Sequence, residues 1–178
     1  MGIAKLNFEL TTRCNLNCGH CLRDRSLNSD LELGLIKKVL KEVKAYGINR
    51  VGFTGGEPLL HPEFKEIIEH CVQEGFSFSL VSNGILIPEF IDFFNSPKIR
   101  DKLQYIAVSL EGADEETNDA VRGRGSFKKA LKGILSLRAK KIPFTIKFTL
   151  NRLNYKKLEE MVLFAGKLEA SQVDLTQL

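Results

Sequence analysis

Three cysteines near the start of the chain have a spacing that suits a metal cluster. Cys14, Cys18 and Cys21 follow an apolar, strand-like run from Ile3 to Leu10. An iron–sulfur cubane is normally held by four thiolates, so three cysteines would leave one iron open to a ligand other than protein. An open coordination position separates a catalytic metal centre from a structural one. The spacing therefore favours a [4Fe–4S] cluster with one free iron.

Three alternatives to a cluster remain open for these cysteines. Offsets of four and three residues would also line one face of a helix, although the intervening asparagines and glycine favour a loop. A zinc site of three cysteines and one histidine would need a finger-like histidine spacing, which His20, His61 and His70 do not show. Disulfides would need an oxidising compartment, and no secretory signal supports one. We favour the cluster and expect a cytoplasmic protein.

Length and composition fit one domain. The chain has 178 residues and no apolar run near the ~20 residues that a membrane span requires. Residues 121–178 carry 13 Lys and Arg against 4 Asp and Glu, which hints at an anionic partner. We favour solvated helix surfaces as the reason for this excess. The lack of a long apolar run argues against a membrane as partner, and the lack of surface aromatic residues interleaved with the basic ones argues against a nucleic acid.

Strand-like and helix-like segments alternate along the whole chain. The expected strands are residues 4–10, 49–54, 77–82, 104–110, 143–149 and 171–176. The expected helices are residues 32–46, 63–74, 87–95, 126–140 and 155–168, and the periodicity of the second makes Cys71 a core residue. Such alternation predicts an α/β fold with a parallel sheet, here a partial (β/α)6-type open barrel.

The sixth strand has no helix after it. An uncovered apolar edge strand is usually avoided. We therefore expect residues 1–178 to be the core domain of a longer protein, truncated after strand six.

Short polar or glycine-rich motifs follow the first four strands. The cysteine loop is the first, and the others are Gly55-Gly56-Glu57-Pro58, Ser82-Asn83-Gly84 and Ser109-Leu110-Glu111. The carboxyl ends of parallel strands share one face, where sites are built. Four motifs on one face indicate a common site.

In this order, the motifs resemble the radical S-adenosylmethionine (SAM) superfamily. The resemblance covers essentially the whole chain and implies a [4Fe–4S] cluster on Cys14, Cys18 and Cys21, with SAM bound to the unique iron. One-electron reduction would cleave SAM to methionine and a 5′-deoxyadenosyl radical, which abstracts hydrogen from a substrate. The alternative is an iron–sulfur binding or redox module without SAM turnover.

The glycine motif has a physical role of its own. Gly55 and Gly56 lack side chains, so a ligand can approach the strand end closely. Backbone carbonyls there, with Glu57, could bind the methionine amino group. An ordinary strand-to-helix turn would also use these residues.

The remaining candidates are polar residues near the other strand ends. Ser82 and Asn83 suit ribose or substrate, and Ser109 suits the ribose or carboxylate of SAM, although a turn or packing accounts for them equally well. Arg122 could bind the SAM carboxylate through its planar fork. His20 stands where family members often carry an aromatic residue and could stack near adenine.

Two further residues are assigned lesser roles. Ser126 could cap the helix that begins near Phe127. Glu111 replaces the aspartate of many relatives, which leaves its positional role open.

The stretch from Ser109 to Leu131 is most similar to members with a C-terminal cluster domain, the SPASM/Twitch type. This branch includes peptide maturases and enzymes of cofactor synthesis. The resemblance thus implies a peptide or small-molecule substrate and a low-potential electron donor such as a flavodoxin or ferredoxin.

Overall fold

A computed structural model describes residues 5–24 and 26–177, in which six parallel strands form one open sheet. The strands lie side by side in chain order, β1-β2-β3-β4-β5-β6. Their bounds are β1 Leu6–Glu9, β2 Arg50–Thr54, β3 Ser77–Ser82, β4 Leu103–Ser109, β5 Phe144–Leu150 and β6 Val173–Gln177. The predicted α/β open barrel is confirmed. Ala4, the first residue of the predicted first strand, lies outside the described residues.

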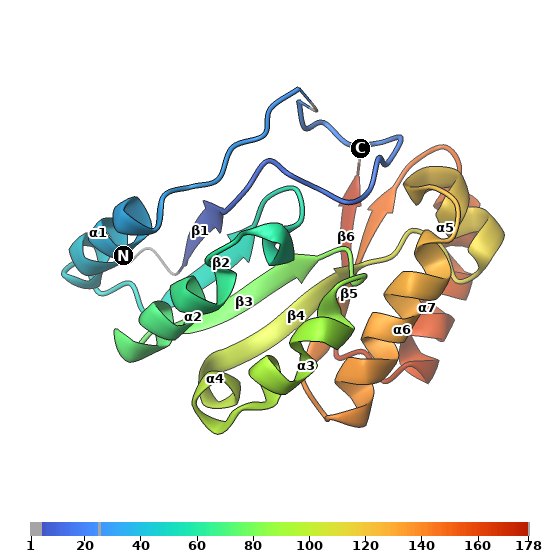
Figure 1. Cartoon of the computed structure of the whole chain (residues 1–178). Coiled ribbons are helices and arrows are strands. Elements are labelled where there is room, and N and C mark those ends of the chain that lie inside the picture. The colour runs from blue at the N-terminus through green and yellow to red at the C-terminus, as the bar shows by residue number, and fades with distance from the viewer. Residues whose placement is uncertain (1–4, 25, 178) are drawn as a thin grey trace.

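Helices connect successive strands along the outside of the curved sheet (Figure 1). Their bounds are α1 Leu33–Lys44, α2 Phe64–Gln73, α3 Ile87–Asn95, α4 Pro97–Lys102, α5 Glu115–Arg122, α6 Ser126–Ala139 and α7 Leu158–Lys167, with 3₁₀ turns at Pro58–Leu60 and Tyr155–Lys157. Parallel neighbours joined by right-handed crossovers place their helices on the same face. The sequence pattern did not predict α4 or α5.

The core fills the space between the sheet and these helices. Alternate strand residues, such as Phe53, Phe78 and Ile146, are fully buried on the helix side. In α2, Phe64 packs edge-on against Phe90 of α3, with ring centroids 5.5 Å apart. Cys71 of α2 is also fully buried, and burial raises the pKa of its thiol to about 12. Its assignment to the core is confirmed.

The other face of the sheet carries polar residues among small and apolar ones such as Val81 and Ala107. Ser79, Thr145 and Lys147 alternate with the buried apolar residues of their strands. Because side chains alternate between the two faces of a strand, these three point away from the helices. The carboxyl end of this face lies under the loop between β1 and α1 (Figure 1).

No helix within residues 5–24 and 26–177 combines the length and apolar character needed to cross a membrane.

Candidate active site

The cysteine loop is irregular, and hydrogen bonds hold its two ends together. Backbone hydrogen bonds join Thr12 N to Ser29 O at 2.9 Å and Leu31 N to Leu10 O at 2.8 Å. The guanidinium of Arg13 forms an ion pair with Asp30 at 2.8 Å. Between these contacts the three cysteines lie outside helix and strand, as their polar spacers predicted. The two ends of the loop are therefore fixed to each other, and the rest of the loop is supported by other parts of the fold.

Gly55 and Gly56 support the loop by direct backbone contact. Gly56 N donates to Thr11 O and Glu57 N donates to Arg13 O, both at 2.7 Å. A Cβ atom on Gly56 would lie 2.2 Å from Arg13 O, and one on Gly55 would lie 2.5 Å from Thr11 O. The chain's own backbone occupies the Cβ positions of these glycines, while both glycines also line the cysteine cavity, where the predicted approach of a ligand stays a prediction. Glycine is required here because two backbone segments approach each other.

Glu57 lies behind the glycines and is fully buried. Its Oε1 accepts hydrogen bonds from Leu59 N at 3.2 Å and Ser82 Oγ at 3.0 Å, and its Oε2 accepts one from Asn83 N at 2.8 Å. Burial raises the pKa of this carboxyl to about 7, against the effect of these donors. The Glu57 carboxylate faces these protein donors, and its expected contact with a cofactor amino group stays a prediction.

Asn83 connects this buried carboxylate to the cysteine loop. Its side-chain Nδ2 donates to Asn15 Oδ1 at 2.6 Å and lies 3.8 Å from Cys14 Sγ. Its backbone N–H is held by Glu57. The end of β3 is therefore fixed on one side by Glu57 and contacts the first cysteine on the other.

The far side of the loop rests on α5. Gly19 N donates to Val121 O at 2.8 Å, and Cys18 Sγ lies 3.9 Å from Arg122 O. Burial raises the pKa of the Cys18 thiol, with Cys14, Cys21 and Glu111 adding to the rise and Arg122 opposing it. The second cysteine is thus buried between the loop and the end of α5.

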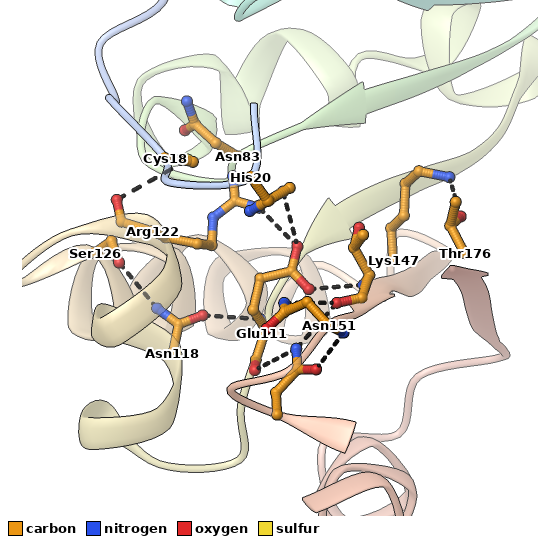
Figure 2. A network of polar contacts seen from close by, with 12 residues as sticks. Cys18, His20, Asn83, Glu111, Asn118, Arg122, Ser126, Lys147, Asn151 and Thr176 are labelled. Atoms are coloured by element: carbon orange, nitrogen blue, oxygen red, sulfur yellow. Dashed lines mark hydrogen bonds and ion pairs between the residues drawn. The ribbon is translucent and has the colours of Figure 1, made fainter. Parts of the chain in front are cut away.

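Glu111 is the centre of the polar network in Figure 2. Its carboxylate lies 3.3 Å from Arg122 Nη1 and accepts a hydrogen bond of 2.6 Å from Thr149 N. Burial raises the pKa of Glu111, while the Arg122 charge lowers it. The sequence left the role of this residue open, and the structure shows that it joins the ends of β4, β5 and α5. A carboxylate directly after a buried strand was the available signal.

His20 completes the network from the cysteine loop. Its Nε2 lies 3.7 Å from Glu111 Oε1. Burial and then the Arg122 charge lower the pKa of His20 below its usual 6.5, which favours the neutral imidazole. The ring thus lies beside Glu111 in a setting that opposes its protonation.

Ser126 belongs to this network as well, and its predicted capping role is wrong. It is the first residue of α6, whose N-cap is Gly125. The actual cap is Asp119 of α5, which accepts from Phe127 N at 2.8 Å and Ser126 Oγ at 2.9 Å. Asn118 Nδ2 also donates to Ser126 Oγ, at 2.9 Å. A capping group from a preceding helix leaves no local sequence pattern.

The motifs meet in one cavity of about 150 Å³ at the carboxyl ends of β1 to β4. It is lined by Cys14, Cys18, His20, Cys21, Arg23, Thr54, Gly55, Gly56, Val81, Ser82, Asn83, Ser109 and Arg122. Every predicted site residue except Glu57 is in this set, while Arg23, Thr54 and Val81 were not predicted. A larger hollow of about 670 Å³ beside His61 has no cysteine in its lining. The site is therefore identified by the residue types that line the smaller cavity and not by the volume of the cavity.

Three buried polar atoms from residues of this cavity lack a hydrogen-bond partner among the described residues. They are Arg122 Nε, Arg23 Nε and His20 Nδ1. An unused guanidinium N–H beside three cysteines suits a ligand that carries a carboxylate. Within the described chain, no three His, Cys, Asp or Glu side chains converge on a single ion. A cubane does not require this, since each thiolate binds a different iron. The residues present therefore fit a cluster with an anionic co-ligand.

Comparison with known proteins places the chain in a family. The model of the "Radical SAM superfamily" matches residues 8–165. An "AdoMet-dependent heme synthase" of Methanosarcina barkeri is 34% identical over 169 residues, covering 92% of this chain and 47% of the relative. "Mycofactocin maturase MftC" of Mycobacterium tuberculosis is 31% identical over 170 residues, covering 93% and 42%. The chain thus spans less than half the length of these relatives.

A solved structure shares the fold. Streptococcus suis SuiB bound to precursor peptide SuiA superposes with a TM-score of 0.85 at 18% identity, covering 99% of this chain and 39% of that one. Enzymes of this family use a [4Fe–4S] cluster and SAM. From its matched length and its relatives, the chain belongs to the radical SAM superfamily.

Proposed function

We propose that Cys14, Cys18 and Cys21 hold a [4Fe–4S] cluster and that SAM binds at its open iron. When bound, the pair supplies a 5′-deoxyadenosyl radical that abstracts hydrogen from a substrate. The observation that supports this most is the single cavity that combines three cysteines with the unsatisfied, buried guanidinium N–H of Arg122. A purely structural metal site would not need that cation.

In this proposal, the first three strands position the cysteines. Glu57 holds the backbone of Asn83, and the Asn83 side chain holds Asn15 beside Cys14. Gly55 and Gly56 let the loop lie directly on the end of β2. The role of Glu57 is thus to position the loop rather than to touch the cofactor.

The later strands would position SAM. Arg122 is 7% exposed and directs its guanidinium into the cavity, with one nitrogen held by Glu111 and Nε unused. We assign the SAM carboxylate to this group, because a charge-assisted hydrogen bond in a desolvated site is strong. Ser82 and Ser109 place hydroxyl groups in the same cavity, where they suit the ribose.

His20 separates the cysteine cavity from a second one of about 360 Å³. Residues of the cysteine loop, α5 and the loop after β5 line this second cavity: Gly19, His20, Ala120, Val121, Asn151, Arg152 and Leu153. Its apolar and polar lining suits a flat heterocycle with exocyclic nitrogen. We therefore assign the adenine of SAM to the His20 side of the site, consistent with a neutral ring that can stack.

The substrate we infer is a peptide or a cofactor precursor. The relatives include a heme synthase and a mycofactocin maturase by name, and SuiB is described with a precursor peptide. The chain spans less than half of these relatives, and the substrate is therefore assigned only by class. We also propose that residues 1–178 act as a core domain, in the cytoplasm, with a flavodoxin- or ferredoxin-type electron donor.

The test is production of 5′-deoxyadenosine from SAM. The protein is reconstituted anaerobically with iron and sulfide, reduced with dithionite and analysed by chromatography. We expect product from the wild type, none from Cys14→Ala, and wild-type iron content in the control Cys71→Ala, because Cys71 lies in the core. A loaded cluster that leaves SAM intact would identify an iron–sulfur module without turnover instead.

A further inference from the structure

The polar inner face of the sheet carries a cation beside the cysteine cavity. Strand register pairs Ser109 of β4 with Lys147 of β5, and Lys147 with Asp174 of β6. Residues paired in this way lie at the same level and on the same face. Ser109 lines the cysteine cavity, so Lys147 is one strand away from it.

The Lys147 ammonium is only weakly engaged. Its Nζ donates to Thr176 Oγ1 at 3.3 Å, as Figure 2 shows, and it forms no ion pair with a carboxylate of the described chain. The nearest acid in register, Asp174, instead accepts hydrogen bonds from Thr145 Oγ1 at 3.3 Å and from Gln172 Nε2. An ammonium has three donors, so at least two remain for a ligand.

This lysine differs from the other basic residues of the second part of the chain. Most of those lie on helices, for example Lys129 of α6, and face solvent. Lys147 lies within a strand, on the face of the sheet opposite the helices, and is intermediate in burial, while the contact of its ammonium with Thr176 is exposed. Solvation of a helix surface does not account for it. A cation on this face, one strand from the cysteine cavity, would attract an anion.

We propose that Lys147, assisted by the Thr176 hydroxyl, binds a carboxylate of the substrate on the inner face of the sheet. This inference rests on the proposed function in one respect. The ligand is taken to be the substrate from which the 5′-deoxyadenosyl radical abstracts hydrogen. The carboxylate would belong to a peptide terminus or to a porphyrin propionate. Either would be bound next to Ser109, with the rest of the molecule extending toward the cysteine cavity.

The test compares acid and neutral forms of two probes on cluster-loaded, unreduced protein. The peptide arm uses N-acetyl-tetra-alanine and its C-terminal amide, followed by NMR. The porphyrin arm uses protoporphyrin IX and its dimethyl ester, followed by fluorescence. Lys147→Met removes the charge at similar volume, Lys147→Arg keeps it, and Lys129→Met is the matched surface control. Circular dichroism and iron content establish that each variant is folded.

We expect the wild type to bind one acid probe at least tenfold more tightly than its neutral partner. This preference should fall below twofold in Lys147→Met and persist in Lys147→Arg and Lys129→Met, and the responding arm identifies the source of the carboxylate. Absence of a preference in both arms, its persistence in Lys147→Met, or its equal loss in Lys129→Met would overturn the proposal. If the wild type shows the preference but does not cleave SAM, the proposed function fails and the carboxylate site stands.

Discussion

Two buried glutamates stabilise the two halves of the site by different chemistry. Glu57, in the half built on β1 to β3, is bound by uncharged donors, two backbone N–H groups and a hydroxyl. Glu111, in the half built on β4, β5 and α5, is paired with the Arg122 guanidinium. The first glutamate fixes backbone that holds the cysteine loop, and the second fixes a charged side chain inside the cavity. In our proposal, the first half positions the cluster and the second half supplies the charge that binds SAM, while the backbone of α5 also supports the cysteine loop.

Replacing Glu111 should have the largest effect on stability. Glu111→Gln keeps the volume but leaves Arg122 buried without its counter-charge, which costs about 3–5 kcal/mol when a buried pair is broken. Chemical denaturation of the two proteins measures the difference.

The matched control is Glu160→Gln, which breaks the exposed Lys157–Glu160 pair and should change stability little. Equal losses of stability in the two variants would mean that the buried Glu111–Arg122 pair contributes no more to stability than an exposed ion pair.

Gly56→Ala should come next and should act on the first half. The added Cβ would meet the Arg13 backbone at 2.2 Å, so the cysteine loop must move, at a cost of about 3 kcal/mol. We expect iron content after reconstitution to fall severalfold.

Gly166→Ala in α7 serves as the control, because its Cβ would meet nothing within 4 Å and alanine favours helix. Full iron content in Gly56→Ala would contradict the docking of the cysteine loop on these glycines.

The pH dependence of stability should separate Glu57 from an ordinary glutamate. Its pKa rises from 4.5 to about 7 on folding, so the folded state binds the proton more tightly than the unfolded state. Its contribution is therefore complete below about pH 4.5 and is lost as pH rises through 7, with a total of at most about 3 kcal/mol.

Denaturation of wild type and Glu57→Gln across this range measures the contribution as a difference. The gap between the two proteins should change between pH 4.5 and 7. A gap that stays constant would mean that Glu57 ionises normally in the folded protein.

The sequence predicted the first half of the site better than the second. A contiguous Gly-Gly-Glu-Pro motif after a strand and three spaced cysteines lie in short windows, so local patterns were sufficient to find them. The backbone partner of the glycines could not be predicted, because Thr11 and Arg13 carry no side-chain signal for it.

The second half depends on contacts between distant residues. Glu111 meets Arg122 eleven positions later and the backbone of Thr149 thirty-eight positions later. Helix α5 was missed because it is short and has only two apolar residues, Ala120 and Val121. The available signals were the Asp114 cap, which accepts from Thr117 N at 2.7 Å, and the terminal Gly123. The six strands, in contrast, were predicted to within a few residues by their apolar runs.

The separate roles proposed for the two halves of the site are tested most directly by measuring SAM affinity in the double variant Glu111→Gln/Arg122→Gln. Removing both charges avoids leaving one buried alone, and the backbone contacts of Val121 and Arg122 with the cysteine loop can remain. We predict full iron content after reconstitution and SAM binding weakened at least tenfold, the loss of about one charge-assisted hydrogen bond. Wild-type affinity for SAM, or loss of the iron, would contradict the assignment of cluster and cofactor charge to separate halves of the sheet.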